Sequence, residues 1–188
     1  MCGSWVEDCP QPTGSSRLTG LTLVRYVGKR RMETRTASGR GNAMNTKSQI
    51  ICGDSRHALN DLPDNSVDTI VTSPPYFNQR NYDDARQVVL ERSPSDYIQS
   101  LVEVFDQCHR VLNEKGTLWL NIGDKYKNGR LLGMPWRVAF ALEDAGWILR
   151  SDVIWHKPNA MPHSVKTRPT TDHEYLFLFS KSATYYYD

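Results

Sequence analysis

A hydroxyl group, two prolines and an aromatic ring directly follow an apolar run of the chain. The run Val67–Thr72 is rich in β-branched residues and is typical of a buried strand. The residues after it are Ser73, Pro74, Pro75, Tyr76 and Phe77. Two consecutive prolines fix both φ angles and remove two N–H donors. The loop therefore presents carbonyl oxygens, a small hydroxyl and a ring, which suit the capture of a planar group that carries an NH2. Ser-Pro-Pro alone also forms ordinary turns, so the strand before it is what makes the pattern specific.

This loop resembles the catalytic motif of the amino-methyltransferases that modify exocyclic amines of DNA bases, which reads Ser/Asp/Asn-Pro-Pro-Tyr/Phe/Trp. Further blocks resemble the group of that family whose catalytic motif lies near the N-terminus. These blocks are 52–55, 62–68, 155–159, 164–170, 173–174 and 179–181. The resemblance covers residues 48–188 and implies a partial Rossmann-like methyltransferase fold.

The resemblance implies transfer of a methyl group from S-adenosylmethionine to the exocyclic amine of a base flipped out of duplex DNA. The amine would donate hydrogen bonds to the Ser73 hydroxyl and the Pro74 carbonyl, which would free its lone pair for in-line attack. Ser73 would be a weak general base, so positioning is expected to contribute more than proton abstraction. Tyr76 would stack on the base. A serine in first place is similar to the cytosine-N4 enzymes. The alternatives are an adenine-N6, RNA or protein-glutamine methyltransferase, or a nucleic-acid-binding remnant without catalysis.

Three residues outside the loop are candidates for binding. Asp54 ends an expected strand and is expected to contact the adenine or ribose of the methyl donor, although an N-cap for a helix from Arg56 onward explains it equally well. Lys157 and Arg168 are expected to touch the DNA backbone. The pair His173–Glu174 does not continue as H-E-x-x-H, so no metal site is predicted.

Alternating strand and helix patterns predict an α/β fold with a mostly parallel sheet and antiparallel strands at the C-terminal end. The expected strands are 49–52, 67–72, 117–122, 147–155, 174–179 and 183–187, and the expected helices are 56–62, 95–112 and 134–145. Residues 113–116 are expected to form a turn, and the last two strands a hairpin. Trp155 is expected in the core.

The first 47 residues differ in composition from the rest of the 188-residue chain. They hold eight Lys and Arg against three acidic residues, and they lack a sustained helical or strand period. Such a segment buries too little apolar surface to offset its ordering entropy. We expect 1–47 to be a basic, disordered extension or sequence upstream of the true start near Met44. An arm that contacts nucleic-acid phosphates is the alternative. The catalytic part is expected at 48–188.

Composition restricts the class of protein further. The mean hydropathy is −0.56, and no stretch approaches the length of apolar sequence that spans a membrane. The four cysteines are scattered without C-x-x-C pairs, which fits a reducing compartment. The N-terminus lacks the apolar region of a signal peptide. We therefore expect a cytoplasmic protein that does not bind a membrane, and the family resemblance implies double-stranded DNA as its partner.

The chain departs from the resembled family in one respect. Those enzymes carry a glycine-rich loop for the methyl donor, Asp-Pro-Phe-x-Gly-x-Gly, and nothing in this sequence matches it. The expected explanations are a fragment, a truncated gene, or a split enzyme whose second chain supplies the donor-binding part. Weak or no activity is expected from the chain alone.

Overall fold

A four-stranded mixed sheet organises the computed structural model, which describes residues 51, 53–77, 93–161 and 164–188. The strand order is β1 (Val67–Thr72), β2 (Leu112–Ile122), β6 (His173–Ser180) and β5 (Ile148–His156). The β1–β2 pair is parallel, whereas β2–β6 and β6–β5 are antiparallel. The α/β prediction with antiparallel strands at the C-terminal end is thereby confirmed. The strand expected at 49–52 and the basic segment 1–47 lie largely or wholly outside the described residues.

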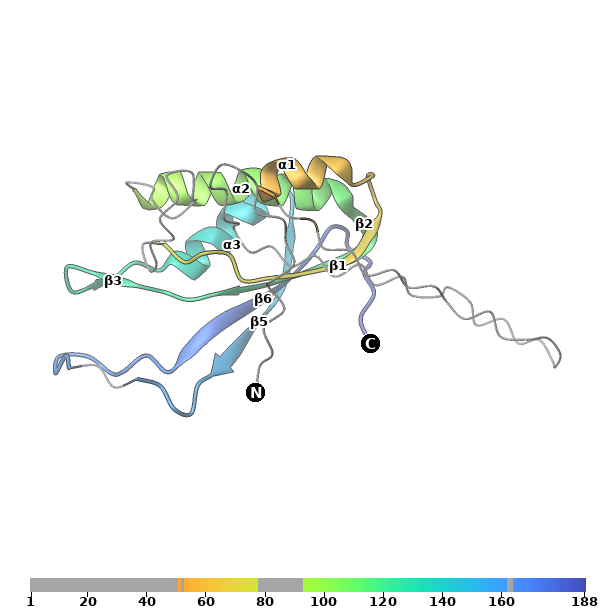
Figure 1. Ribbon diagram of the computed structural model, residues 1–188. Coiled ribbons are helices and arrows are strands. Elements are labelled where there is room, and N and C mark those ends of the chain that lie inside the picture. Colours follow the sequence, from red (N-terminus) through yellow and green to blue (C-terminus); the bar gives the residue numbers. More distant parts are fainter. Residues whose placement is uncertain (1–50, 52, 78–92, 162–163) are drawn as a thin grey trace.

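The helices cover one face of this sheet. They are α1 (Ser55–Ala58), the short 3-10 helix η1 (Leu59–Asp61), α2 (Pro94–Val111) and α3 (Met134–Asp144). Figure 1 shows α1, α2 and α3 together on the same side of the strands. The side chains of the sheet that face them are fully buried, and they include Ile70, Leu118, Leu120, Phe177 and Phe179. A small hairpin, β3 (Tyr126–Lys127) with β4 (Arg130–Leu131), projects from the end of β2.

The start of α2 corrects one sequence prediction. The helix begins at Pro94 and its N-cap is Ser93, whose hydroxyl accepts a hydrogen bond from Asp96 N at 3.2 Å. Ser95, where the helix was expected to begin, already lies inside it. Proline suits the first helical position because its fixed φ is helical and an N–H there would have no partner. The expected end of α3 is confirmed, with Gly146 at φ 100° directly after the C-cap.

The turn expected at 113–116 is wrong. The parallel register moves from Val67 opposite Leu112 to Thr69 opposite Thr117, so β2 gains extra residues against β1. These residues bulge within β2 and do not reverse the chain. The Asn113 amide donates to the Asp68 carboxylate, which fastens the bulge to β1. Polar turn-type residues therefore mark a bulge here.

Two expectations for the C-terminal region are also wrong. No strand forms at 183–187, because both edges of β6 are already taken by β2 and β5. Trp155 is not in the core, since 55% of it is exposed. It lies opposite Glu174 near the end of the edge strand β5, on the sheet face turned away from buried Phe177.

Cys108 gives a test of this packing. The thiol lies on the buried face of α2, and burial raises its pKa to about 12. A thiol without thiolate character is a poor nucleophile. We expect Cys108 to resist a thiol-alkylating reagent at pH 8 in buffer and to react rapidly in concentrated urea. Peptide mass spectrometry would read the labelling at this site, and equal labelling in both conditions would contradict the buried position.

In the part of the chain that the structure describes, no helix is both long and apolar enough to cross a membrane.

Candidate active site

One end of each of the four strands lies on the same side of the sheet, where β1, β2 and β5 end and β6 begins. The carboxyl ends of β1 and β2 coincide because these strands are parallel, and antiparallel β6 begins where they end. β5, antiparallel to β6, also ends there. In open α/β sheets, ligands bind outside the carboxyl ends of the strands. This edge is where Ser73–Tyr76, Asn121, Lys157 and Glu174 come together.

The loop after β1 is held firmly against α2. Its middle is fixed by a hydrogen bond from the Tyr97 hydroxyl of α2 to the Pro75 carbonyl, 2.8 Å long. Phe77 is buried, with its ring centroid 5.5 Å from that of Tyr97. Pro74 is buried and Ser73 is exposed. The loop therefore presents the Ser73 hydroxyl to solvent from a rigid backbone.

Five side chains form a hydrogen-bonded group that we call the Tyr76 cluster: Ser73, Tyr76, Asn121, Lys157 and Glu174. The Tyr76 hydroxyl donates to Glu174 Oε2 at 2.9 Å and accepts from Ser73 Oγ at 3.2 Å. The Asn121 amide donates to the Tyr76 hydroxyl at 3.2 Å and to Glu174 Oε2 at 3.0 Å. Lys157 Nζ binds the other oxygen of Glu174. The cluster links the Ser73–Tyr76 loop to β2, to β6 and to the residue that directly follows β5.

Burial and hydrogen bonding together set the charge states in the cluster. Burial raises the pKa of Tyr76 to about 12, against a hydrogen bond from Ser73 and with the help of the neighbouring Glu174 charge. Burial alone would also raise the pKa of Glu174, but hydrogen bonds from Lys157, Asn121 and Tyr76 outweigh it and leave that pKa below its ordinary value. At neutral pH the phenol is therefore neutral and the carboxylate is ionised.

Gly123 makes room for the tyrosine ring. A Cβ at this position would lie 2.9 Å from Tyr76 Cε2 and 3.2 Å from Cδ2. Contacts of that length are shorter than van der Waals separation, so any other residue would push the ring away. The glycine directly after β2 thus determines where the ring lies.

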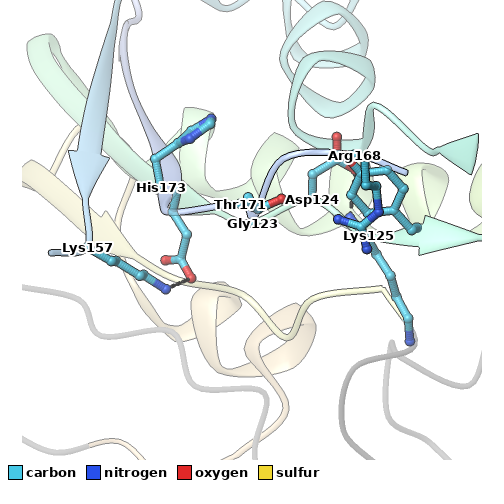
Figure 2. A pocket seen from close by; sticks show the side chains of 9 residues that line it. Gly123, Asp124, Lys125, Lys157, Arg168, Thr171 and His173 are labelled. Atoms are coloured by element: carbon cyan, nitrogen blue, oxygen red, sulfur yellow. Dashed lines mark hydrogen bonds and ion pairs between the residues drawn. The ribbon is translucent and has the colours of Figure 1, made fainter. Parts of the chain in front are cut away.

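A pocket of about 360 Å³ lies beside the cluster. It is lined by Gly123, Asp124, Lys125, Tyr126, Lys157, Arg168, Thr171, His173 and Glu174. Figure 2 shows Lys157 on one side of this pocket, joined to the Glu174 carboxylate, and Arg168 on the other side beside Lys125. The Arg168 guanidinium lies 3.5 Å from the ring centroid of Tyr126. The lining carries three basic side chains, Lys125, Lys157 and Arg168, against the two carboxylates of Asp124 and Glu174, and this excess of positive charge favours an anionic ligand such as a phosphate.

The structure brings most of the predicted site residues together. Ser73–Tyr76 belongs to the same strand-end site as Lys157, and Lys157 and Arg168 line the same pocket. Asp54 is not among the residues of that pocket. It caps α1 by accepting from Arg56 N at 3.0 Å, and hydrogen bonding to the Arg56 side chain holds the pKa of this carboxyl below its usual value.

Sequence reasoning missed Asn121, Glu174 and Tyr97. Asn121 lies at the end of β2 and Glu174 at the start of β6. A polar residue at a strand end was the available signal, because strand ends line the crevice of such sheets. Tyr97 gave no such signal, since a tyrosine on the apolar side of an amphipathic helix is ordinarily part of the core.

The described ranges 51, 53–77, 93–161 and 164–188 contain no group of three or more His, Cys, Asp or Glu side chains able to hold a metal ion.

Two solved structures illustrate the similarity of this fold to known proteins. The cytosine-N4-specific PvuII DNA methyltransferase is 22% identical, with a TM-score of 0.60 over 72% of this chain and 50% of that one. The TTHA0409 protein of Thermus thermophilus, solved with S-adenosyl-L-methionine, is 25% identical, with a TM-score of 0.54 over 72% of this chain and 54% of that one. Fold and strand-end loop thus define an α/β protein of the methyltransferase class.

Sequence comparison narrows the class to one family. The chain belongs to the DNA methylase family, whose model matches residues 67–188. Type II methyltransferase M.Cfr9I of Citrobacter freundii is 45% identical over 72% of this chain and 55% of its own length. M.SmaI of Serratia marcescens is 43% identical over 74% of this chain and 58% of its own length. The chain thus spans little more than half the length of these relatives.

Acid should weaken the fold through Glu174. Because its pKa is lower in the folded protein than the ordinary 4.5, its contribution to stability is complete above that value and is lost as pH falls through the folded value. We expect wild type to lose stability more steeply than Glu174→Gln between pH 5 and pH 3. Urea unfolding at several pH values would measure this, with Glu143→Gln on the exposed side of α3 as the control. Parallel curves for wild type and Glu174→Gln would contradict the prediction.

Proposed function

We propose that this chain transfers a methyl group from S-adenosylmethionine to the exocyclic amine of a base flipped out of double-stranded DNA, with cytosine N4 as the target. The observation that carries the proposal is the rigid Ser-Pro-Pro-Tyr loop, which holds an exposed Ser73 hydroxyl beside a basic pocket. Membership of the DNA methylase family and similarity to type II methyltransferases support it. Serine at the first motif position supports cytosine over adenine.

The proposed catalysis is mainly positioning. The target amine donates hydrogen bonds to Ser73 Oγ and to the Pro74 carbonyl, which draws its nitrogen from planar towards tetrahedral geometry. Its lone pair leaves conjugation with the ring and becomes a better nucleophile. Tyr76 provides a ring on which the base stacks. Once methylated, the nitrogen is cationic and its proton is strongly acidic, so a weak base suffices.

The described residues do not by themselves fit a site for the methyl donor. The glycines in these segments do not form a hollow for a ligand. Some have a positive φ, and at the others an added Cβ would meet protein atoms. They are Gly53, Gly116, Gly123, Gly129, Gly133 and Gly146. Asp54 is the proposed donor contact, and its carboxylate is already bonded to Arg56. A second chain that brings the donor-binding part belongs to the proposal.

Lys157 and Arg168 are the proposed contacts to the DNA backbone. Both line the pocket next to the loop, where a flipped nucleotide would bring its phosphate. Lys157 has an internal partner in Glu174, so its ammonium would be shared between carboxylate and phosphate. Neutralising either side chain should reduce the salt dependence of DNA binding by about one phosphate contact.

A product analysis tests this function. The chain would be incubated with S-adenosylmethionine labelled in its methyl group and with mixed-sequence duplex DNA, and the digested nucleosides would be separated by mass spectrometry. We expect N4-methyldeoxycytidine at low yield from wild type and none from Ser73→Ala. N6-methyldeoxyadenosine, or label in RNA or glutamine side chains, would support the alternative enzymes. No product from the chain alone, together with salt-sensitive DNA binding that survives Ser73→Ala and Tyr76→Ala, would favour nucleic-acid binding without catalysis.

A further inference from the structure

We propose that Glu174 is a positioning residue that fixes the direction of the hydrogen-bond chain from Ser73 through Tyr76, and thereby makes the site select an amine over a carbonyl. The inference rests on the proposed function and names the determinant of its selectivity. It starts from the three linked groups: Ser73 Oγ, the Tyr76 hydroxyl 3.2 Å away, and Glu174 Oε2, which lies 2.9 Å from that hydroxyl.

An ionised carboxylate can only accept hydrogen bonds. Glu174 is ionised, and 18% of its side chain is exposed, so leaving one of its oxygens unpaired would be costly. If the Tyr76 proton pointed elsewhere, the phenol oxygen and Glu174 Oε2 would face each other 2.9 Å apart with only lone pairs between them. The neutral Tyr76 hydroxyl must therefore point its single proton at Glu174. Its oxygen is left to accept, and both Ser73 Oγ and the Asn121 amide donate to it.

The Glu174 carboxylate also determines the orientation of the Asn121 side-chain amide. Its NH2 group faces both Glu174 Oε2 and the Tyr76 hydroxyl, while its own carbonyl oxygen is buried without a hydrogen-bond partner among the described residues. The opposite orientation of this amide would place two acceptors 3.0 Å apart. The amide takes the orientation that serves the carboxylate.

The consequence falls on Ser73. A serine hydroxyl has one proton and two lone pairs, and the proton is committed to Tyr76. Only lone pairs are left to face a ligand, so Ser73 can accept from the NH2 of cytosine but cannot donate to the carbonyl that uracil has at the same position. The Glu174 carboxylate, at the other end of the hydrogen-bond chain from Ser73, thus determines which base is accepted.

Glu174→Gln should reverse this direction. The two carboxylate oxygens have different partners, Lys157 at Oε1 and Tyr76 with Asn121 at Oε2. A glutamine would turn its carbonyl towards the Lys157 ammonium and its NH2 towards Tyr76, because an NH2 beside an ammonium is unfavourable. The Asn121 amide, which donates to the same position in wild type, would rotate to present its carbonyl to that NH2. The phenol would then accept from glutamine and donate to Ser73, which frees the serine proton. Adding Lys157→Met removes the ammonium and lets the glutamine carbonyl return to Tyr76.

The test compares the binding of dCMP and dUMP to the full chain by NMR titration. We expect wild type to prefer dCMP by about tenfold, as loss of one oriented hydrogen bond in a partly exposed site implies. Glu174→Gln should reduce that preference to about twofold or less while dUMP binding is retained. The double variant Glu174→Gln/Lys157→Met should restore the preference for dCMP, with Lys157→Met alone as its control. An equal loss of both nucleotides in Glu174→Gln, or an unchanged preference, would overturn the inference.

A second measurement needs no ligand. The phenol of Tyr76, assigned with Tyr76→Phe in tyrosine-labelled protein, should titrate near 12 in wild type and lower in Glu174→Gln. Nucleotide binding with an unaltered phenol titration would overturn the inference and leave the proposed function standing. Wild type that binds neither nucleotide would overturn the proposed function and the selectivity with it, and the titration would still decide whether Glu174 holds Tyr76.

Discussion

Replacing Phe177 with alanine is expected to lower the free energy of unfolding by about 3–5 kcal/mol. Phe177 lies in β6 with no exposed surface, and its ring centroid is 5.2 Å from that of Trp136 on α3 and 5.7 Å from that of Tyr175. Truncation would remove apolar burial and leave a cavity between the sheet and α3. Urea unfolding followed by tryptophan fluorescence would measure the change.

Phe140→Ala is the matched control for this loss. The same ring type lies on α3, but 55% of Phe140 is exposed, so its truncation should change the free energy of unfolding by less than about 1 kcal/mol. Similar losses from both variants would show that Phe177 does not lie in the core.

Gly123→Ala is expected to destabilise the protein by about 1–3 kcal/mol and to disturb the Tyr76 cluster. The added methyl would lie 2.9 Å from a ring carbon of Tyr76, whose hydroxyl is tied to Ser73, Asn121 and Glu174. The ring cannot yield without losing those bonds, so we also expect the Tyr76 pKa to fall below about 12. Urea unfolding and the phenol titration would measure the two effects.

Gly53→Ala is the control, because the nearest atom to a Cβ there, Ala58 Cβ, lies at an ordinary 3.7 Å. The double variant Tyr76→Ala/Gly123→Ala should lose less stability than the sum of the two single variants, since the methyl then has no ring to displace. Additive losses would mean that the methyl and the ring do not meet.

The sequence predicted those parts of the fold that depend on local composition. Val67–Thr72 forms β1 with the expected bounds because β-branched residues favour a strand. Which strands pair with each other does not depend on local composition. β6 pairs with β2 across more than fifty residues, and a pattern of alternation does not say which edge a strand will take. The hairpin expected between 174–179 and 183–187 did not form for this reason, and the buried position expected for Trp155 was wrong for the same reason.

The same distinction holds for the site. Ser73–Tyr76 could be recognised from the sequence, because two prolines and an aromatic residue after a strand are unusual. Glu174 lies 98 residues from Tyr76 in sequence, and only the antiparallel return of β6 brings its carboxylate to the loop. The spacing of Lys157 and Glu174 likewise gave no sign that they form an ion pair, so the interpretation of Lys157 as a phosphate contact omitted its internal partner.

The position of β6 has a consequence for how the protein folds during synthesis. It is the last strand of the sheet along the chain, yet it lies between β2 and β5 and supplies every hydrogen-bonded partner of β5 in the described sheet. Until residue 180 has left the ribosome, β2 exposes an unpaired edge and β5 has no strand to join. Nascent chains stalled before that point should therefore depend on chaperones and aggregate when these are depleted.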